Sequence, residues 1–172
     1  MPGEEQLQVE YTINNYVATY QFPVEQDLDL DLLLLRSIMK FNQAPDLEDF
    51  PLSEIPEYNP DSFPGAIFKF QKPKVTILLF KNGKSVLTGG RTREIVESGR
   101  DRLTNWILET GVLPSLEIGP VKIENIVCHG VIKRPGLQTV IDLNRVIVMF
   151  ENSMYEPEIF PGLIYKVTSP AI

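Results

Sequence analysis

Few residues of this chain of 172 amino acids could carry out catalysis. Cys128 and His129 are its single cysteine and its single histidine, and together they could form a nucleophile and its base. The alternative is a strand dipeptide without a catalytic role. The sequence favours this alternative, because one histidine without a suitable carboxylate makes no complete catalytic set. A lone cysteine also excludes an internal disulfide.

Two short motifs resemble calcium-binding or phosphate-binding loops but lack essential residues. The acids of DLDLD, Asp27 to Asp31, alternate as at the start of a calcium loop, yet leucines follow where that loop needs a glycine and a later glutamate. NGKS, from Asn82 to Ser85, imitates the end of a phosphate loop, but Leu78 stands where that loop has its first glycine. We therefore expect no metal, no cofactor and no enzymatic activity.

Charge is distributed unevenly along the chain, whose formal net charge is −7. Residues 1–61 carry thirteen acids and two bases, whereas Ala66 to Arg93 carry seven bases and no acid. Such a basic stretch is either a solvated strand face or a surface that holds phosphates, since screening makes the local field matter more than the total charge. No apolar run reaches the roughly 18 residues of a membrane span. The N-terminus also lacks the features of a signal peptide, so we expect an intracellular protein without membrane contact.

One phrase occurs twice in the sequence. EYNPDSFPGAIFKFQKP, residues 57–73, matches MYEPEIFPGLIYKVTSP, residues 154–170, at eight of seventeen positions with an offset of 97. A weaker match with an offset of 110 relates residues 13–22 to residues 123–132. The difference between the offsets predicts an insertion of thirteen residues in the first copy, for which the acidic loop around residues 41–55 is the candidate. We therefore predict two repeats, residues 1–119 and 120–172.

The elements that would position these residues follow the order strand, helix, antiparallel strands, helix. β-branched and aromatic residues predict the strands, and an acidic start followed by helix formers predicts the first helix. Asn82-Gly83 predicts a tight hairpin turn, and apolar spacing predicts a long second helix in which Gly99 is a weak point. The expected strands are 7–22, 65–70, 74–80, 84–89, 121–132 and 164–167, and the expected helices are 27–41, 92–110 and 137–150.

The second repeat is incomplete in this sequence. At the offset of 97, the counterparts of Phe80 and of the helix at 92–110 would lie beyond Ile172. Either the sequence is a fragment of a longer chain, or another chain completes the exposed sheet edge, which would make a dimer.

The chain resembles the TATA-box-binding protein family in YNPDSFPGAIFKFQKPKVTILLFKNGKSVLTGG and YEPEIFPGLIYKV. The resemblance covers the first repeat almost entirely and the second as far as Ile172. It implies an α+β saddle, in which a curved antiparallel sheet carries helices on its convex face and a pseudo-twofold axis relates the repeats. It also implies a transcription initiation factor that binds A/T-rich DNA in the minor groove and bends it, the known mode of this family.

The resemblance assigns DNA-binding roles to positions in both repeats. Phe63, Phe80 and Phe160 match the phenylalanines that this family wedges between base pairs, with core packing as the alternative role. Asn15 and Asn125 match the central asparagines, whose amide donors suit adenine N3 and thymine O2. The other matching residues of the expected DNA surface are Val17, Pro64, Leu78, Val86, Thr88, Val127 and Pro161.

Charged residues are assigned in the same way. The expected phosphate-binding bases are Lys69, Lys74, Lys84 and Lys166. Glu156 and Glu158 lie in a loop that matches the docking site of a B-type initiation factor, where carboxylates would guide orientation more than affinity. For these lysines and glutamates, an ordinary soluble surface is the alternative. An A-type factor and other transcription regulators are further expected partners, the latter on the convex side around Arg91–Glu109.

Three departures from the family pattern leave a second function open. Asp61 and Ser62 precede the first wedge where a base is common, the first repeat has its acidic insertion, and half of the second repeat is absent. The chain could therefore be an interaction module of the transcription machinery that has lost autonomous DNA binding. The expected location is the nucleus for a eukaryotic or viral protein, and the cytoplasm or nucleoid for an archaeal one.

Overall fold

The computed structural model describes residues 8–43, 52–113, 115, 117, 119–133 and 140–167. They belong to two compact units, one formed by residues 9–132 and the other by residues 1–8 together with 133–172. No helix in the described ranges is long and apolar enough to span a membrane.

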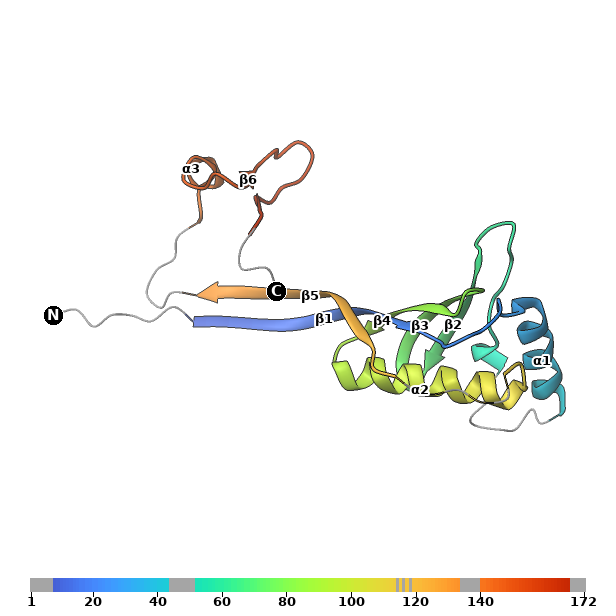
Figure 1. The fold of residues 1–172 in the computed structure, drawn as a ribbon. Helices are drawn as coiled ribbons and strands as arrows, with labels where there is room; N and C mark the ends of the chain where they lie inside the picture. The colour runs from blue at the N-terminus through green and yellow to red at the C-terminus, as the bar shows by residue number, and fades with distance from the viewer. Residues whose placement is uncertain are drawn as a thin grey trace. The chain divides into compact units, whose positions relative to one another are not determined.

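The larger unit is built around a five-stranded sheet with the strand order β2-β3-β4-β1-β5 (Figure 1). β2 (Gly65–Gln71), β3 (Lys74–Phe80) and β4 (Lys84–Gly90) form two successive antiparallel hairpins. β1 (Gln8–Gln21) pairs antiparallel with β4, and β5 (Lys122–Lys133) lies on the other side of β1. The strands that the sequence predicts for this unit are confirmed to within one residue at each end.

The turn between β3 and β4 forms where Asn82-Gly83 predicts it. Gly83 has a φ of +78°, and its N–H donates to the carbonyl of Phe80 at 2.9 Å. The side chain of Asn82 accepts the N–H of Lys84 at 3.0 Å. A Cβ at position 83 would lie 2.7 Å from the carbonyl oxygen of Phe22, so both the conformation and the space require glycine.

The core of this unit lies between the sheet and two helices, α1 (Leu30–Gln43) and α2 (Arg93–Thr110). Trp106 of α2 packs against the rings of Phe68 and Phe70, with centroid distances of 6.1 and 5.9 Å. Its indole N–H donates to the hydroxyl of Ser37 in α1 at 3.0 Å, which joins both helices to the sheet. The other strand residues of the core include Ala18, Tyr20, Val75, Ile77, Leu79 and Leu87.

Capping residues stand at both ends of α2. The hydroxyl of Thr92 accepts the N–H of Ile95 at 3.3 Å, and Gly111 ends the helix in the left-handed conformation. Gly99 has a packing role that its interpretation as a weak point missed. A Cβ there would lie 2.8 Å from Cγ1 of Val75, so the glycine lets the helix approach β3 closely.

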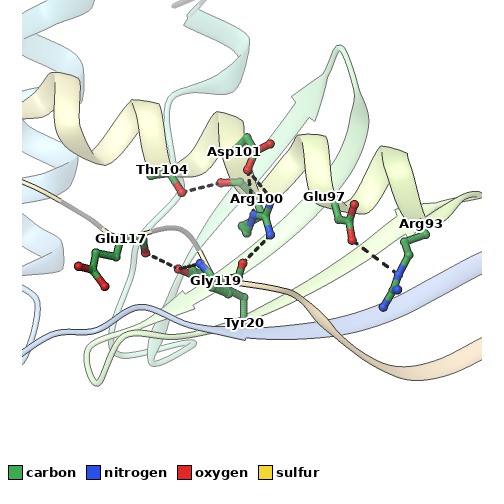
Figure 2. Close-up of polar contacts among 8 residues, drawn as sticks. All are labelled: Tyr20, Arg93, Glu97, Arg100, Asp101, Thr104, Glu117 and Gly119. Carbon is green, nitrogen blue, oxygen red and sulfur yellow. Dashed lines mark hydrogen bonds and ion pairs between the residues drawn. The ribbon is translucent and has the colours of Figure 1, made fainter.

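The segment that leads into β5 is held by α2 and β1 (Figure 2). Arg100 donates to the carbonyl of Gly119 at 2.5 Å and to the carboxylate of Asp101 at 2.7 Å. The hydroxyl of Tyr20 donates to the carbonyl of Glu117 at 2.9 Å and accepts the N–H of Gly119 at 3.2 Å. These contacts fix the point at which β5 joins the sheet.

The prediction of an acidic loop over residues 41–55 is wrong at both of its ends. Residues 41–43 complete α1, and Leu52–Glu54 forms a 3-10 helix, while residues 44–51 lie outside the described ranges. Glu54 is only 2% exposed, accepts the N–H of Gln71 at 2.6 Å and pairs with Arg102. Glu54 therefore anchors this segment to β2 and α2, because its partners allow the carboxylate to be buried.

The smaller unit contains α3 (Leu143–Ile147), β6 (Ser153–Met154) and β7 (Ile164–Tyr165), and the two strands pair antiparallel. Of the helix predicted over residues 137–150, residues 143–147 are helical and residues 140–142 and 148–150 are not, while residues 137–139 lie outside the described ranges. Asp142 caps it by accepting the N–H of Asn144 at 3.1 Å. No residue of α3 is buried, so the packing that normally stabilises a longer helix is lacking.

Candidate nucleic-acid interface

One face of the sheet in the larger unit is directed away from the core. Along β1 to β4, successive side chains point to opposite sides of the sheet. One set is buried against the helices and includes Ala18, Phe68, Ile77 and Leu87. The outward side chains are partly or fully exposed, and we call them the open face: Asn15, Val17, Thr19, Ile67, Lys69, Thr76, Leu78, Phe80, Val86 and Thr88. Six of the predicted DNA-contacting residues thus share one surface, as strand alternation requires.

Phe63 and Phe80 lie together at the edge of the open face. Their ring centroids are 5.7 Å apart, with the planes inclined by 59°. Phe80 is paired in register with Gly65, where a Cβ would come within 2.9 Å of Cε1 of Phe63 and 3.2 Å of Cδ1 of Phe80. The two rings therefore occupy the space above the glycine. Both stay partly exposed, and neither belongs to the core under the helices.

The repeated phrase adopts the same turn in both units. The carbonyl of Asn59 accepts the N–H groups of Ser62 and Phe63, and the carbonyl of Glu156 accepts those of Ile159 and Phe160, at 2.9 to 3.1 Å. The ring of Phe160 also lies over a glycine, since a Cβ at Gly162 would be 2.7 Å from its Cε1. Pro64 and Pro161, which follow the two phenylalanines, are exposed.

Asn15 is held rigidly on the open face by β4. Its side-chain oxygen accepts the N–H of Gly89 at 2.6 Å, and its amide nitrogen donates to the hydroxyl of Thr88 at 3.1 Å. An amide nitrogen carries two hydrogens, so one donor remains for a ligand. The backbone N–H of Gly89 fixes which end of the amide carries the donors.

The predicted phosphate-binding lysines differ in their surroundings. Lys74 and Lys84 are exposed and form no ion pair with any residue in the described ranges. Lys69 is paired with Glu57 at 2.6 Å. Glu57 is fixed there because its backbone exchanges two hydrogen bonds with Ile67, at 2.9 and 2.8 Å. An acid that the sequence analysis did not identify therefore competes with phosphate for Lys69.

A second acid reaches the open face from β5. The hydroxyl of Thr19 donates to Glu124 at 2.8 Å, and Lys122 lies 3.1 Å from the same carboxylate. The hydrogen bond from Thr19, and then that from Lys122, lowers the pKa of Glu124 below its usual value. Alternation in β1 could have identified Thr19, but Glu124 becomes apparent only from the pairing of two strands that are far apart in sequence.

The predicted residues of the second repeat are exposed in the structure. Asn125 and Val127 lie on β5, where the side chain of His129 contacts Asn14 at 2.7 Å. No described hydrogen bond joins Asn15 to Asn125, so their shared role stays a prediction. The same holds for the residues of the smaller unit: Glu156, Glu158, Phe160, Pro161 and Lys166.

Nothing in the described ranges assembles a catalytic or metal centre around Cys128, which is exposed. No group of three or more histidine, cysteine, aspartate or glutamate side chains there could hold a metal ion.

Comparison with known proteins gives consistent matches. A family model described as "Transcription factor TFIID (or TATA-binding protein, TBP)" matches residues 10–110 and 120–172. The TATA-box-binding protein of Pyrobaculum aerophilum is 37% identical over 163 residues, which are 94% of this chain and 69% of that protein. The one from Pyrodictium occultum is 36% identical over 171 residues, 99% of this chain and 73% of that protein.

A solved structure also resembles this chain. Methanococcus jannaschii TBP matches with a TM-score of 0.60 and 28% identity, over 92% of this chain and 77% of the other. Together with the antiparallel sheet and its helices, this similarity confirms the predicted α+β fold class. The relatives named here are archaeal, and they give no support to the nuclear location.

Proposed function

Because the chain belongs to the TATA-binding protein family of transcription factors, we propose that it binds A/T-rich promoter DNA in the minor groove during transcription initiation. The observation that carries this proposal is the open face, which combines Asn15 with the apolar side chains of Val17, Leu78 and Val86 and has the Phe63–Phe80 pair at its edge. Such a surface suits A·T pairs, whose minor groove presents acceptors and lacks the guanine amino group.

The paired rings would act as one wedge. Phe63 and Phe80 are in contact and project from adjacent segments, so they can enter the same base step together. Insertion of apolar side chains unstacks a step and bends the duplex, as is known for this family. Phe160 would supply the corresponding wedge of the second repeat, and Lys74 and Lys84 would hold phosphates.

Asn15 would act as a preorganised donor to the base pairs. Its contacts with Thr88 and Gly89 hold the amide, so little side-chain entropy is lost when its second hydrogen meets adenine N3 or thymine O2. Guanine in the same position would place its amino group against this donor. Asn15 would therefore contribute to the preference for A·T pairs.

Fluorescence anisotropy with a labelled TATA duplex and a G/C-substituted duplex tests the proposal. We expect preference for the TATA duplex and a loss of about tenfold or more in the Phe63→Ala, Phe80→Ala double variant. Phe150→Ala is the matched control, because this phenylalanine is exposed and packs on Tyr165 in the smaller unit. Equal binding of both duplexes, or unchanged affinity in the double variant, would refute minor-groove recognition.

A B-type initiation factor is the partner proposed for Glu156 and Glu158. Their exposed carboxylates are available to basic residues, and rim charges of this kind mainly change association rates. We expect the Glu156→Lys, Glu158→Lys variant to bind DNA normally but to assemble the ternary complex with an archaeal B-type factor more slowly. A ternary complex that forms at the unchanged rate would remove these residues from the interface.

Two acids favour a second candidate, a family member that binds proteins and has lost autonomous DNA binding. Glu57 neutralises Lys69, and Glu124 lies beside Thr19 of the open face. This alternative would be supported if the folded protein binds neither DNA duplex at low salt and still binds an initiation factor. In either case we propose that the protein acts in the cytoplasm at the nucleoid, as its archaeal relatives suggest.

A further inference from the structure

A groove on the larger unit lies outside the open face. It has a volume of about 550 Å³ and is formed by the segment between β1 and α1 together with the segment that follows α2. Its apolar lining consists of Pro23, Val24, Leu28, Leu32, Val112 and Leu113, and most of these side chains are partly exposed. The structure therefore offers a shallow apolar depression to solvent.

Acidic residues surround this apolar floor. Glu25, Asp27 and Asp29 line the groove, and Asp31 follows in the first turn of α1. Asp29 has a structural role, because its carboxylate accepts the N–H of Leu32 at 2.8 Å. The other three are exposed and form no ion pair with any residue that the structure describes. Their charges are available to a basic ligand.

The apolar surface continues from the groove along α1. Leu35, Ile38 and Met39 follow Leu32 at intervals of three and four residues and are 54%, 40% and 50% exposed. The buried side of the helix carries Leu30, Leu33 and Ser37. By helical spacing these lie opposite Leu35, so α1 is apolar on the face that solvent contacts as well as on its core face. An exposed apolar strip of this kind marks an interaction surface.

We propose that this groove and the outer strip of α1 bind a basic amphipathic helix of a partner protein. Apolar side chains of the partner would lie along Leu32, Leu35 and Met39, whose spacing matches a helix laid against a helix. Lysine or arginine side chains on its flanks would pair with Glu25, Asp27 and Asp31.

The negative charge around the groove favours a basic helix over nucleic acid, an acidic peptide or a second copy of this chain. Nucleic acid and an acidic peptide would be repelled by the carboxylates. A second copy of this chain would have to present its basic stretch, and Ala66 to Arg93 forms strands and turns rather than a helix. The site uses none of the open-face residues, so it can be occupied whether or not DNA is bound there.

Selection from a random 16-residue peptide library displayed on phage, with the full chain as bait, tests the proposal. We expect enriched peptides to carry several lysines or arginines and apolar residues at intervals of three and four. The anisotropy of the most enriched synthetic peptide then gives its affinity. A Glu25→Gln, Asp27→Asn variant and a Leu35→Ser, Met39→Ser variant should each bind it about tenfold more weakly. The matched control is Glu94→Gln with Glu151→Gln, which removes two exposed acids elsewhere and should leave the affinity unchanged.

Several outcomes would overturn the assignment. They are the absence of enrichment, an enriched pool without this pattern, and binding of the peptide by the two groove variants with the affinity of the wild type. Sedimentation velocity adds another: a dimer that the Leu35→Ser, Met39→Ser variant loses would assign the strip to self-association. DNA affinity, measured on the same variants, should stay unchanged. Failure of the docking proposal is thereby separated from failure of DNA binding.

Discussion

Replacement of Glu57 by glutamine tests whether the acids beside the open face limit DNA binding. Glu57 lies 2.6 Å from Lys69, and their side chains are 63% and 51% exposed. Exposed pairs contribute only about 0 to 1 kcal/mol to stability, so the variant should fold. The backbone hydrogen bonds between residue 57 and Ile67 do not depend on the side chain and should persist. The substitution therefore changes charge with little change in structure.

The expected size of the effect follows from counterion release. A lysine that neutralises one more phosphate steepens the dependence of log affinity on log salt concentration by about 0.9. Between about 200 and 50 mM KCl, the affinity of Glu57→Gln should therefore rise roughly 3.5-fold more than that of the wild type. The same substitution also removes one negative charge from the protein surface that would face DNA. The affinity of the variant for the TATA duplex should therefore be higher than that of the wild type at every salt concentration.

Anisotropy titrations of a TATA duplex at several KCl concentrations measure both quantities. In a Lys69→Gln background, Glu57→Gln should no longer steepen the slope, because no lysine is released. Glu109→Gln is the matched control, since Glu109 pairs with Lys40 of α1 away from the open face. The reasoning is refuted if the slope of Glu57→Gln equals that of the wild type, or if the steepening persists without Lys69.

Three further substitutions test other contacts. Gly65→Ala should cost about 1–3 kcal/mol in urea unfolding, because its Cβ would press on the ring of Phe63 at 2.9 Å. Glu54→Ala should cost about 3 kcal/mol in the same assay, since it removes the acid that pairs with Arg102 in a largely buried site. Thr19→Val should raise the pKa of Glu124 toward its usual value in an NMR titration, because the main cause of its lowering is lost. The hydrogen bond from Thr19 stabilises the fold above the usual carboxyl pKa and is lost as the pH falls through the lowered one, so Thr19→Val should reduce stability at neutral pH only.

Local patterns in the sequence predict the sheet of the larger unit well. Alternation identifies which side of β3 carries Leu78 and Phe80, and Asn82-Gly83 identifies the hairpin that sets its register with β4. The repeated phrase singles out Phe63 and Phe160, whose side chains are partly or fully exposed, and their DNA-binding role stays a prediction. The predictions of the strands and of the turn are confirmed, because strand periodicity and turn chemistry depend on neighbouring residues.

Contacts between distant segments could not be predicted in the same way. The burial of Glu54 depends on Arg102, which is 48 residues away, and Glu124 reaches Thr19 across 105 residues. In isolation, Gly99 suggests a weak helix, and its fit against Val75 exists only in the packed structure. The helix predicted over residues 137–150 is shorter in the structure for a related reason, since none of the residues of α3 (143–147) is buried.

The turn that occurs in both copies of the repeated phrase shows which features depend on the phrase alone and which depend on β3. In both units the backbone N–H of the phenylalanine donates to the carbonyl four residues before it, that of Asn59 or Glu156. The glycine two residues after the phenylalanine leaves space beneath the ring. Phe63 has a second ring against it, supplied by Phe80 at the end of β3. The phrase alone thus presents one phenylalanine at the surface, whereas the hairpin that follows adds a second ring that packs on it. The proposed function therefore predicts that DNA bending depends more on Phe63 and Phe80 than on Phe160, which has no ring packed on it within the part of the chain that the structure describes.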